Sequence, residues 1–192
     1  MKNLYLIRTG LLTINDIQNV CYCMPDLITL VINQAVSSLG DDSIEIICNN
    51  LIHLKQLDLI NTVISDNAVT LICNTPHLCS NLTRLNLTMS SKISNNCLNL
   101  IADNLRRLTT LYLTSCFGIS NISFLQNMKT LNYLNINNTS IDTHRIKEYL
   151  LPNLPECEVE YGHEKILSSK SIWTINSSRN SVCSFWLFCW KI

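Results

Sequence analysis

An apolar motif with a fixed spacing runs through most of this 192-residue chain. It has the form Leu-x-x-Leu-x-Leu, with isoleucine, valine, cysteine or methionine at some positions, and it returns every 23 to 28 residues. A constant period of this length means that one small structural unit is repeated, and that each unit buries its apolar side chains against its neighbours. The five clearest copies are Leu27, Leu30 and Ile32; Leu54, Leu57 and Leu59; Leu82, Leu85 and Leu87; Leu108, Leu111 and Leu113; and Leu131, Leu134 and Ile136. A weaker copy follows at Leu154, Cys157 and Val159, and a truncated copy opens the chain at Met1, Leu4 and Leu6.

Each motif predicts a short strand and a tight turn. Its last two apolar residues, such as Leu57 and Leu59, are two positions apart, and side chains in a strand alternate between its faces, so both point into one core. Three positions later a small residue follows, because an inward turn excludes large side chains. A Thr, Ser or Cys there can also bond the backbone of the turn. The residues at this position are Thr9, Ala35, Thr62, Ser90, Cys116 and Thr139.

Helix-start signals come next in each unit. They are Leu39-Gly40-Asp41, Ile64-Ser65-Asp66, Ile93-Ser94, Ile119-Ser120 and Ile141-Asp142. Ser and Asp side chains accept hydrogen bonds from the unpaired N–H groups of a first helical turn. The runs 66–73 and 95–104 that follow have helical spacing. The sequence therefore predicts an α/β solenoid of about six to seven leucine-rich repeats, with a curved parallel sheet on the concave side and short helices on the convex side. Such a fold offers a long surface rather than a pocket.

The repeats divide the chain into two parts. Residues 1–161 form the predicted repeat domain, which begins inside a repeat. Residues 162–192 are a tail without the motif, and its end, SVCSFWLFCWKI, is rich in aromatic side chains. Three interpretations of the tail stay open: a cap over the last repeat, an exposed interaction or membrane-surface segment, or an artefact of the gene model.

Charge and hydropathy exclude several classes of protein. The 14 basic and 14 acidic residues give a net charge of zero, which disfavours nucleic-acid binding through a broad basic face. No run of 18 uncharged apolar residues predicts a transmembrane segment. The first residues make a poor signal peptide because Arg8 interrupts the apolar run. We therefore expect a cytoplasmic or nuclear protein, or one present in both compartments.

Five of the ten cysteines fall at repeat positions. Cys21, Cys48 and Cys73 fall at one position near the end of the predicted helix. Cys116 falls at the small-residue turn, and Cys157 replaces a core leucine. No Cys-x-x-Cys pair occurs and the four histidines complete no ligand set, so no metal or other cofactor is expected. We interpret these cysteines as reduced, buried packing groups.

Motifs of catalysis are also missing from the sequence. It has no Gly-x-Ser-x-Gly nucleophile elbow and no glycine-rich phosphate loop, and it contains only four glycines. The sequence thus predicts a binding protein and no enzyme.

The run IEIICNNLIHLKQLDLINTVISDNAVTLICN resembles the cysteine-containing class of leucine-rich repeats, which ends its helix with Cys and follows its strand with Cys or Thr and then Ile-Ser/Thr-Asp. The run LRRLTTLYLTSCFGIS has the same pattern, with Cys116 after the strand. The resemblance covers roughly residues 1–160. Such repeats are typical of F-box leucine-rich repeat proteins and of AMN1-like relatives that lack the F-box. The resemblance implies recognition of a substrate or partner within SCF-type ubiquitin ligases. Ligase components would then be partners, but the sequence shows no F-box to bind them.

The concave face is the predicted binding surface. Strand residues between the core positions point to it, and they are mostly neutral and polar, with Tyr112 and Tyr133 on adjacent strands. Tyrosine is enriched at the hot spots of protein interfaces. The alternative that these tyrosines only cover the sheet stays open. We expect a monomer that binds a protein partner through Gln56, Asp58, Arg84, Asn86, Thr110, Tyr112, Tyr133 and Asn135.

Three glutamates, Glu156, Glu158 and Glu160, follow in the last weak unit. They could attract a basic segment of a partner. The interpretation that we favour is a solvated edge that prevents further stacking.

Two other functions stay open. The chain could be a scaffold or assembly factor without a role in ubiquitin transfer, like the small mitochondrial proteins related to ATP synthase subunit s. It could also be a fragment of a larger repeat protein, because Leu4 and Leu6 would form an uncapped core at its start.

Overall fold

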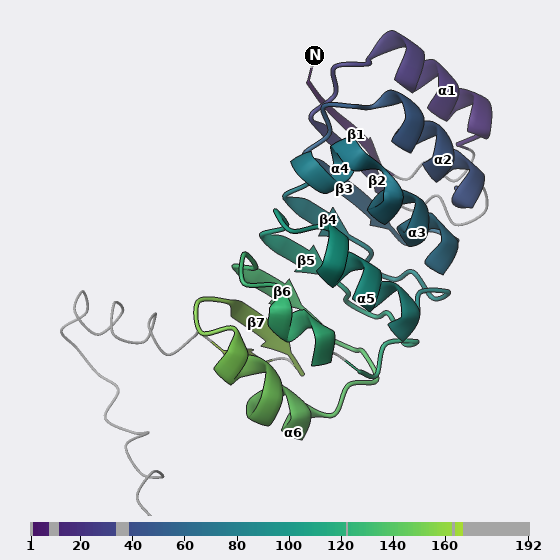
Figure 1. Cartoon of the computed structure of the whole chain (residues 1–192). Coiled ribbons are helices and arrows are strands. Elements are labelled where there is room, and N and C mark those ends of the chain that lie inside the picture. The colour runs from purple at the N-terminus through teal and green to yellow at the C-terminus, as the bar shows by residue number, and fades with distance from the viewer. Residues whose placement is uncertain (1, 8–11, 34–38, 122, 163, 167–192) are drawn as a thin grey trace, which may run out of the picture.

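A computed structural model describes residues 2–7, 12–33, 39–121, 123–162 and 164–166 of the chain. One sheet of eight strands runs the length of the molecule in sequence order, and the helices line one side of it (Figure 1). Strands β1 to β7 are parallel, whereas β8 pairs antiparallel with β7. The strands are β1 (Asn3–Ile7), β2 (Thr29–Asn33), β3 (Gln56–Ile60), β4 (Arg84–Asn86), β5 (Thr110–Tyr112), β6 (Tyr133–Asn135), β7 (Glu158–Tyr161) and β8 (Glu164–Ile166).

The motif leucines form the core between the sheet and the helices. Neighbouring strands align Leu30, Leu57, Leu85, Leu111 and Leu134 in one row, and each is fully buried. Because every strand contributes one residue to this row, adjacent units bury each other's apolar side chains. The predicted α/β solenoid of leucine-rich repeats, with its parallel sheet and its helices on the opposite side, is confirmed.

Three of the long helices begin where the sequence predicts: α2 (Asp41–Asn50), α3 (Asp66–Asn74) and α5 (Asn95–Asn104). No start was predicted for the first long helix, α1 (Ile14–Cys23). The Ser65 hydroxyl accepts a hydrogen bond from Asn67 N, and the Ser94 hydroxyl accepts one from Asn96 N. Both serines therefore cap their helices as expected. A short additional helix, α4 (Pro76–Asn81), occupies the extra length of the longest unit and was not predicted.

The helix predicted to start at Ile119-Ser120 is absent. A five-residue 3-10 helix, η1 (Ser123–Asn127), stands there instead. Only 11 residues separate Ile119 from Leu131, against 14 between Ile93 and Leu108, so a ten-residue helix with its connections does not fit. The next unit is also short and is covered by α6 (Thr143–Arg145), the π-helical turn η2 (Ile146–Leu150) and the 3-10 helix η3 (Leu151–Asn153).

The carboxyl end of the described sheet differs from the favoured prediction. The glutamates Glu158 and Glu160 lie on β7, but β7 is not an edge strand, because β8 pairs with it through Val159↔Ile166 and Glu160↔Lys165. Their predicted role as a solvated edge is therefore wrong. Parallel stacking ends here because β8 runs in the opposite direction. Residues 167–192, which include the aromatic part of the tail, lie outside the described residues, as do Thr9 and Ala35.

The small-residue turns have the predicted bond to their own backbone at two of four described positions. The Thr62 hydroxyl donates to Leu59 O at 3.5 Å, and the Thr139 hydroxyl donates to Ile136 O at 2.9 Å. The Cys116 thiol donates to Leu87 O of the preceding unit at 3.0 Å. The Ser90 hydroxyl is buried without a partner among the described residues. The residue before each turn has a positive φ: Asn61, Met89, Ser115 and Asn138.

The cysteines of the repeats are buried free thiols, as predicted. This holds for Cys21, Cys48, Cys73, Cys116 and Cys157. None of the described helices is long and apolar enough to cross a bilayer.

Candidate protein-binding surface

The eight predicted binding residues form two rows on the face of the sheet that carries no helix, hereafter the concave face. Strand register aligns Gln56, Arg84, Thr110 and Tyr133 in the first row. It aligns Asp58, Asn86, Tyr112 and Asn135 in the second. The two rows are two positions apart on each strand, so all eight side chains point to the same side. The structure therefore brings the whole predicted set together.

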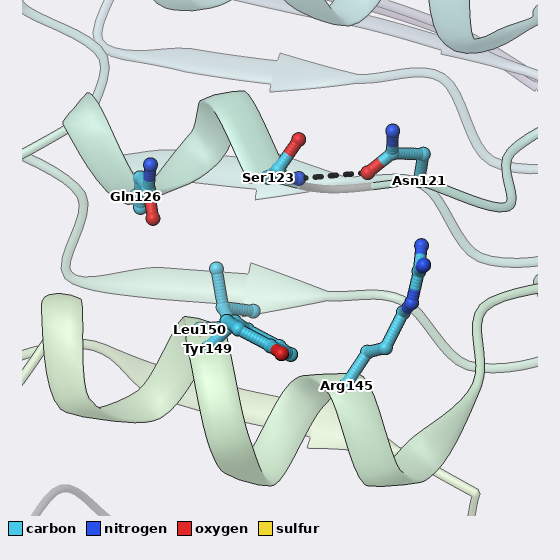
Figure 2. A pocket seen from close by; sticks show the side chains of 6 residues that line it. All are labelled: Asn121, Ser123, Gln126, Arg145, Tyr149 and Leu150. Atoms are coloured by element: carbon cyan, nitrogen blue, oxygen red, sulfur yellow. Dashed lines mark hydrogen bonds between the residues drawn. The ribbon is translucent and has the colours of Figure 1, made fainter.

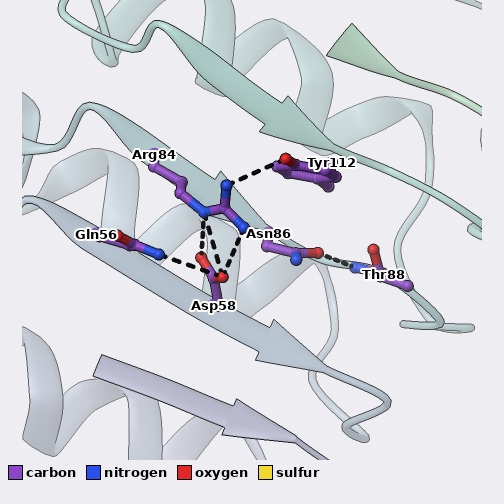
Figure 3. A network of polar contacts seen from close by, with 6 residues as sticks. All are labelled: Gln56, Asp58, Arg84, Asn86, Thr88 and Tyr112. Atoms are coloured by element: carbon purple, nitrogen blue, oxygen red, sulfur yellow. Dashed lines mark hydrogen bonds and ion pairs between the residues drawn. The ribbon is translucent and has the colours of Figure 1, made fainter. Parts of the chain in front are cut away.

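An ion pair joins β3 and β4 at the centre of these rows (Figure 3). Arg84 Nη2 lies 3.0 Å from Asp58 Oδ2, and Arg84 Nε donates to both carboxylate oxygens at 3.1 and 3.2 Å. Gln56 Nε2 donates to Asp58 Oδ2 at 3.5 Å. Burial alone would lower the pKa of Arg84, but its hydrogen bonds with Asp58 and the carboxylate charge reverse this and raise it. The positive charge of Arg84 is thus neutralised within the face.

The tyrosines continue this network across the next strands. Arg84 Nη1 donates to the Tyr112 hydroxyl at 3.1 Å, and its guanidinium carbon lies 4.5 Å from the centre of the Tyr112 ring. The rings of Tyr112 and Tyr133 are 5.0 Å apart and tilted by 43°. Both contacts have the geometry of attractive cation–π and aromatic pairs. The two rings are therefore held in place by their neighbours.

The network ends on β7. Asn135 Nδ2 donates to Glu160 Oε2 at 2.6 Å and to the Tyr133 hydroxyl at 3.3 Å, while Asn135 Oδ1 accepts from the Thr114 hydroxyl at 2.7 Å. Burial raises the pKa of Tyr133 to about 12, and the Glu160 carboxylate adds to this shift. Contacts thus link strands β3 to β7. Glu160 and Thr114 were absent from the predicted set because their roles depend on contacts with Asn135, which strand alternation does not reveal.

Accessibility divides the predicted residues into two groups. Asp58, Asn86 and Asn135 are only 3%, 5% and 8% exposed. These three organise their neighbours; Asn86 Oδ1, for example, accepts from Thr88 N at 3.0 Å. The remaining residues are half-buried, and they are the ones that a partner could touch: Gln56, Arg84, Thr110, Tyr112 and Tyr133.

This chain has the architecture of a leucine-rich repeat protein, and solved structures of that class are similar to it. One is an internalin (inlF) from Listeria monocytogenes, with a TM-score of 0.59 and 24% identity over 84% of this chain and 42% of that one. Another is internalin C2 (inlC2) from the same organism, with a TM-score of 0.55 and 21% identity over 82% of this chain and 69% of that one. The chain thus spans less than half of the first internalin. These likenesses establish the fold alone.

No family model matches the sequence, and no curated protein matches it.

Proposed function

We propose that this chain is a protein-binding module whose partner docks on the concave face around Tyr112 and Tyr133. The observation that carries the proposal is the ordered pair of rings, 5.0 Å apart, with the Arg84 guanidinium beside one of them. Side chains that are already fixed lose little conformational entropy when a partner binds. Large amphipathic rings also contribute disproportionately to protein interfaces. We expect no catalytic activity.

The double substitution Tyr112→Ala/Tyr133→Ala tests this placement. Partner proteins captured from an extract of the source cells should bind the variant at least about tenfold more weakly, as expected for a hot spot. Tyr22→Ala is the matched control, because Tyr22 is an exposed tyrosine on α1. Urea denaturation should show that both variants remain folded. If the double variant captures the same proteins as the wild type, the partner does not bind at the tyrosines.

The finer proposal is that the bound protein is a substrate or regulator in SCF-type, ubiquitin-dependent degradation, in the cytoplasm or nucleus. Its support is the resemblance of the cysteine-bearing repeats to those of F-box leucine-rich repeat proteins and AMN1-like proteins. Affinity purification from source cells should recover ubiquitin ligase components. Recovery of one stable assembly without ligase components would instead favour a scaffold or assembly factor of the ATP synthase subunit s type.

A further inference from the structure

A cavity of about 280 Å³ lies on the helix-bearing side of the solenoid, between η1 and the helical segment 143–150 (Figure 2). Its lining residues are Asn121, Ser123, Gln126, Arg145, Tyr149 and Leu150. It occurs where the units shorten, because the five residues of η1 stand where the preceding unit has the ten residues of α5. The shorter helix leaves space that the next helical segment does not fill.

Most polar side chains around this cavity have no partner among the described residues. The Arg145 side chain makes no hydrogen bond or ion pair with the residues that the structure describes. Within the same described ranges, the side chains of Ser123, Gln126 and Tyr149 also make no hydrogen bond. Asn121 uses Oδ1 to accept from Ser123 N at 3.1 Å, which leaves its amide nitrogen as a donor. The cavity therefore presents unused donors from two neighbouring units.

Among the described residues that line the cavity, Arg145 is the charged one. No carboxylate is among its described lining residues. The nearest acidic residues along the chain have other contacts, since Glu148 Oε2 lies 3.3 Å from His144 Nδ1 and Asp142 Oδ1 accepts from His144 N. In Figure 2 the Arg145 side chain extends from its helix toward Asn121 on the opposite wall. Arg84 differs, because Asp58 and Tyr112 already occupy its donors.

We propose that this cavity binds an anionic group, a carboxylate or a phosphoryl group, with Arg145 as the charged ligand. The planar guanidinium offers two parallel donors to such oxygens. The Asn121 amide and the Ser123 and Tyr149 hydroxyls supply further donors around it. The site is separate from the concave face, so its test is independent of the proposed function.

The test is a titration of the isotope-labelled 192-residue chain, followed by its assigned amide and arginine Nε resonances in NMR spectra. Sodium phosphate and sodium acetate are the two probes, each compared with sodium chloride at equal ionic strength. Saturable shifts of Asn121, Ser123 and the Arg145 Nε signal, with half-saturation in the millimolar range, would support the site. Saturation by phosphate alone identifies a phosphoryl site, and saturation by acetate alone identifies a carboxylate site.

Two variants make the result specific. Arg145→Gln should weaken binding roughly tenfold, as expected for the loss of charge-assisted hydrogen bonds. Lys147→Gln removes an exposed positive charge from the same helical segment but not from the cavity lining, so its titration should match the wild type. Shifts that do not saturate, or that are unchanged in Arg145→Gln, would overturn the proposal.

Discussion

At the scale of single residues, the turns after strands β3 to β6 share one backbone conformation with different side chains. Asn61, Met89, Ser115 and Asn138 occupy equivalent positions and all have φ between 53° and 61°. The backbone N–H of Asn61, Met89 and Ser115 donates to a carbonyl of the next unit at 2.8 Å, so neighbouring units fix this conformation. Asparagine tolerates the left-handed region, but methionine does not favour it. Met89 therefore carries backbone strain.

We predict that Met89→Asn stabilises the protein. The Met89 side chain is 51% exposed, so little packing is lost, and the relief of strain should raise the free energy of unfolding by about 1 kcal/mol. Urea denaturation measures this change. The reverse substitution at the equivalent position, Asn138→Met, should lower the free energy of unfolding. A less stable Met89→Asn protein would show that the methionine side chain makes a contact that outweighs the strain.

At the scale of secondary-structure elements, the first residue of one helix supports the cap of the next. Asp41 accepts hydrogen bonds from the backbone N–H and the hydroxyl of Ser65. Asp66 accepts the same two bonds from Ser94. In the next unit Asn95 Oδ1 accepts from Ser120 N at 2.9 Å, and its amide nitrogen donates to the Ser120 hydroxyl. We call this series the Asp–Ser joint. It holds adjacent helices in register.

We predict that Asp66→Ala lowers the free energy of unfolding by about 2 kcal/mol, because two bonds to a carboxylate are lost and the cap of α5 is weakened. Asp66→Asn should cost less, since Asn95 performs the same role with an amide. Thermal and urea denaturation would measure both changes. Asp103→Ala is the control, since Asp103 is exposed on α5. Equal losses for Asp66→Ala and Asp103→Ala would argue against the joint.

The elements that the sequence predicted well are those fixed by local rules. The strands and the helices α3 and α5 followed from apolar spacing and from Ser65 and Ser94, because burial and capping act within a few residues. The short helix η1 was missed because Ile119-Ser120 has the same start signal as its neighbours, and only the shorter distance to Leu131 excludes a long helix. On the concave face, alternation predicted which side chains share a surface. Alternation could not show that Arg84 and Asp58 form an ion pair, because the pair depends on the side-chain rotamers of residues on two neighbouring strands.

At the scale of the whole molecule, buried thiols run from the first helix to the last parallel strand. Burial raises the pKa of Cys21, Cys48 and Cys116 to about 11, and that of Cys73 and Cys157 to about 12, from an ordinary value of 9.0. It raises the pKa of Cys97 as well. The folded protein therefore holds these protons more tightly than the unfolded chain does.

This difference predicts a loss of stability at alkaline pH. Below pH 9 the thiols are protonated in both the folded and the unfolded state, and their contribution to stability is complete. Above pH 9 the unfolded chain releases thiol protons that the folded protein keeps. This continues until the pH reaches the raised pKa values of about 11 to 12. The free energy of unfolding should fall between pH 9 and 11 by at most about 1.4 kcal/mol per thiol and pH unit. Urea denaturation under reducing conditions would measure the slope. Cys73→Ala should reduce the slope of the free energy of unfolding against pH, whereas Cys23→Ala, at an exposed position, should leave that slope unchanged.

The Asp–Ser joint also has a consequence for how such a chain can grow. Residues 65–93 begin with Ser65, which donates a hydrogen bond to Asp41. They also contain Asp66, which accepts a hydrogen bond from Ser94. A tandem duplication of this segment would place a new Ser65 opposite the first Asp66 and leave the second Asp66 opposite Ser94. Both ends of the inserted unit would form the same Asp–Ser hydrogen bonds as before. A single genetic event could therefore lengthen the sheet and its concave face without compensating substitutions elsewhere.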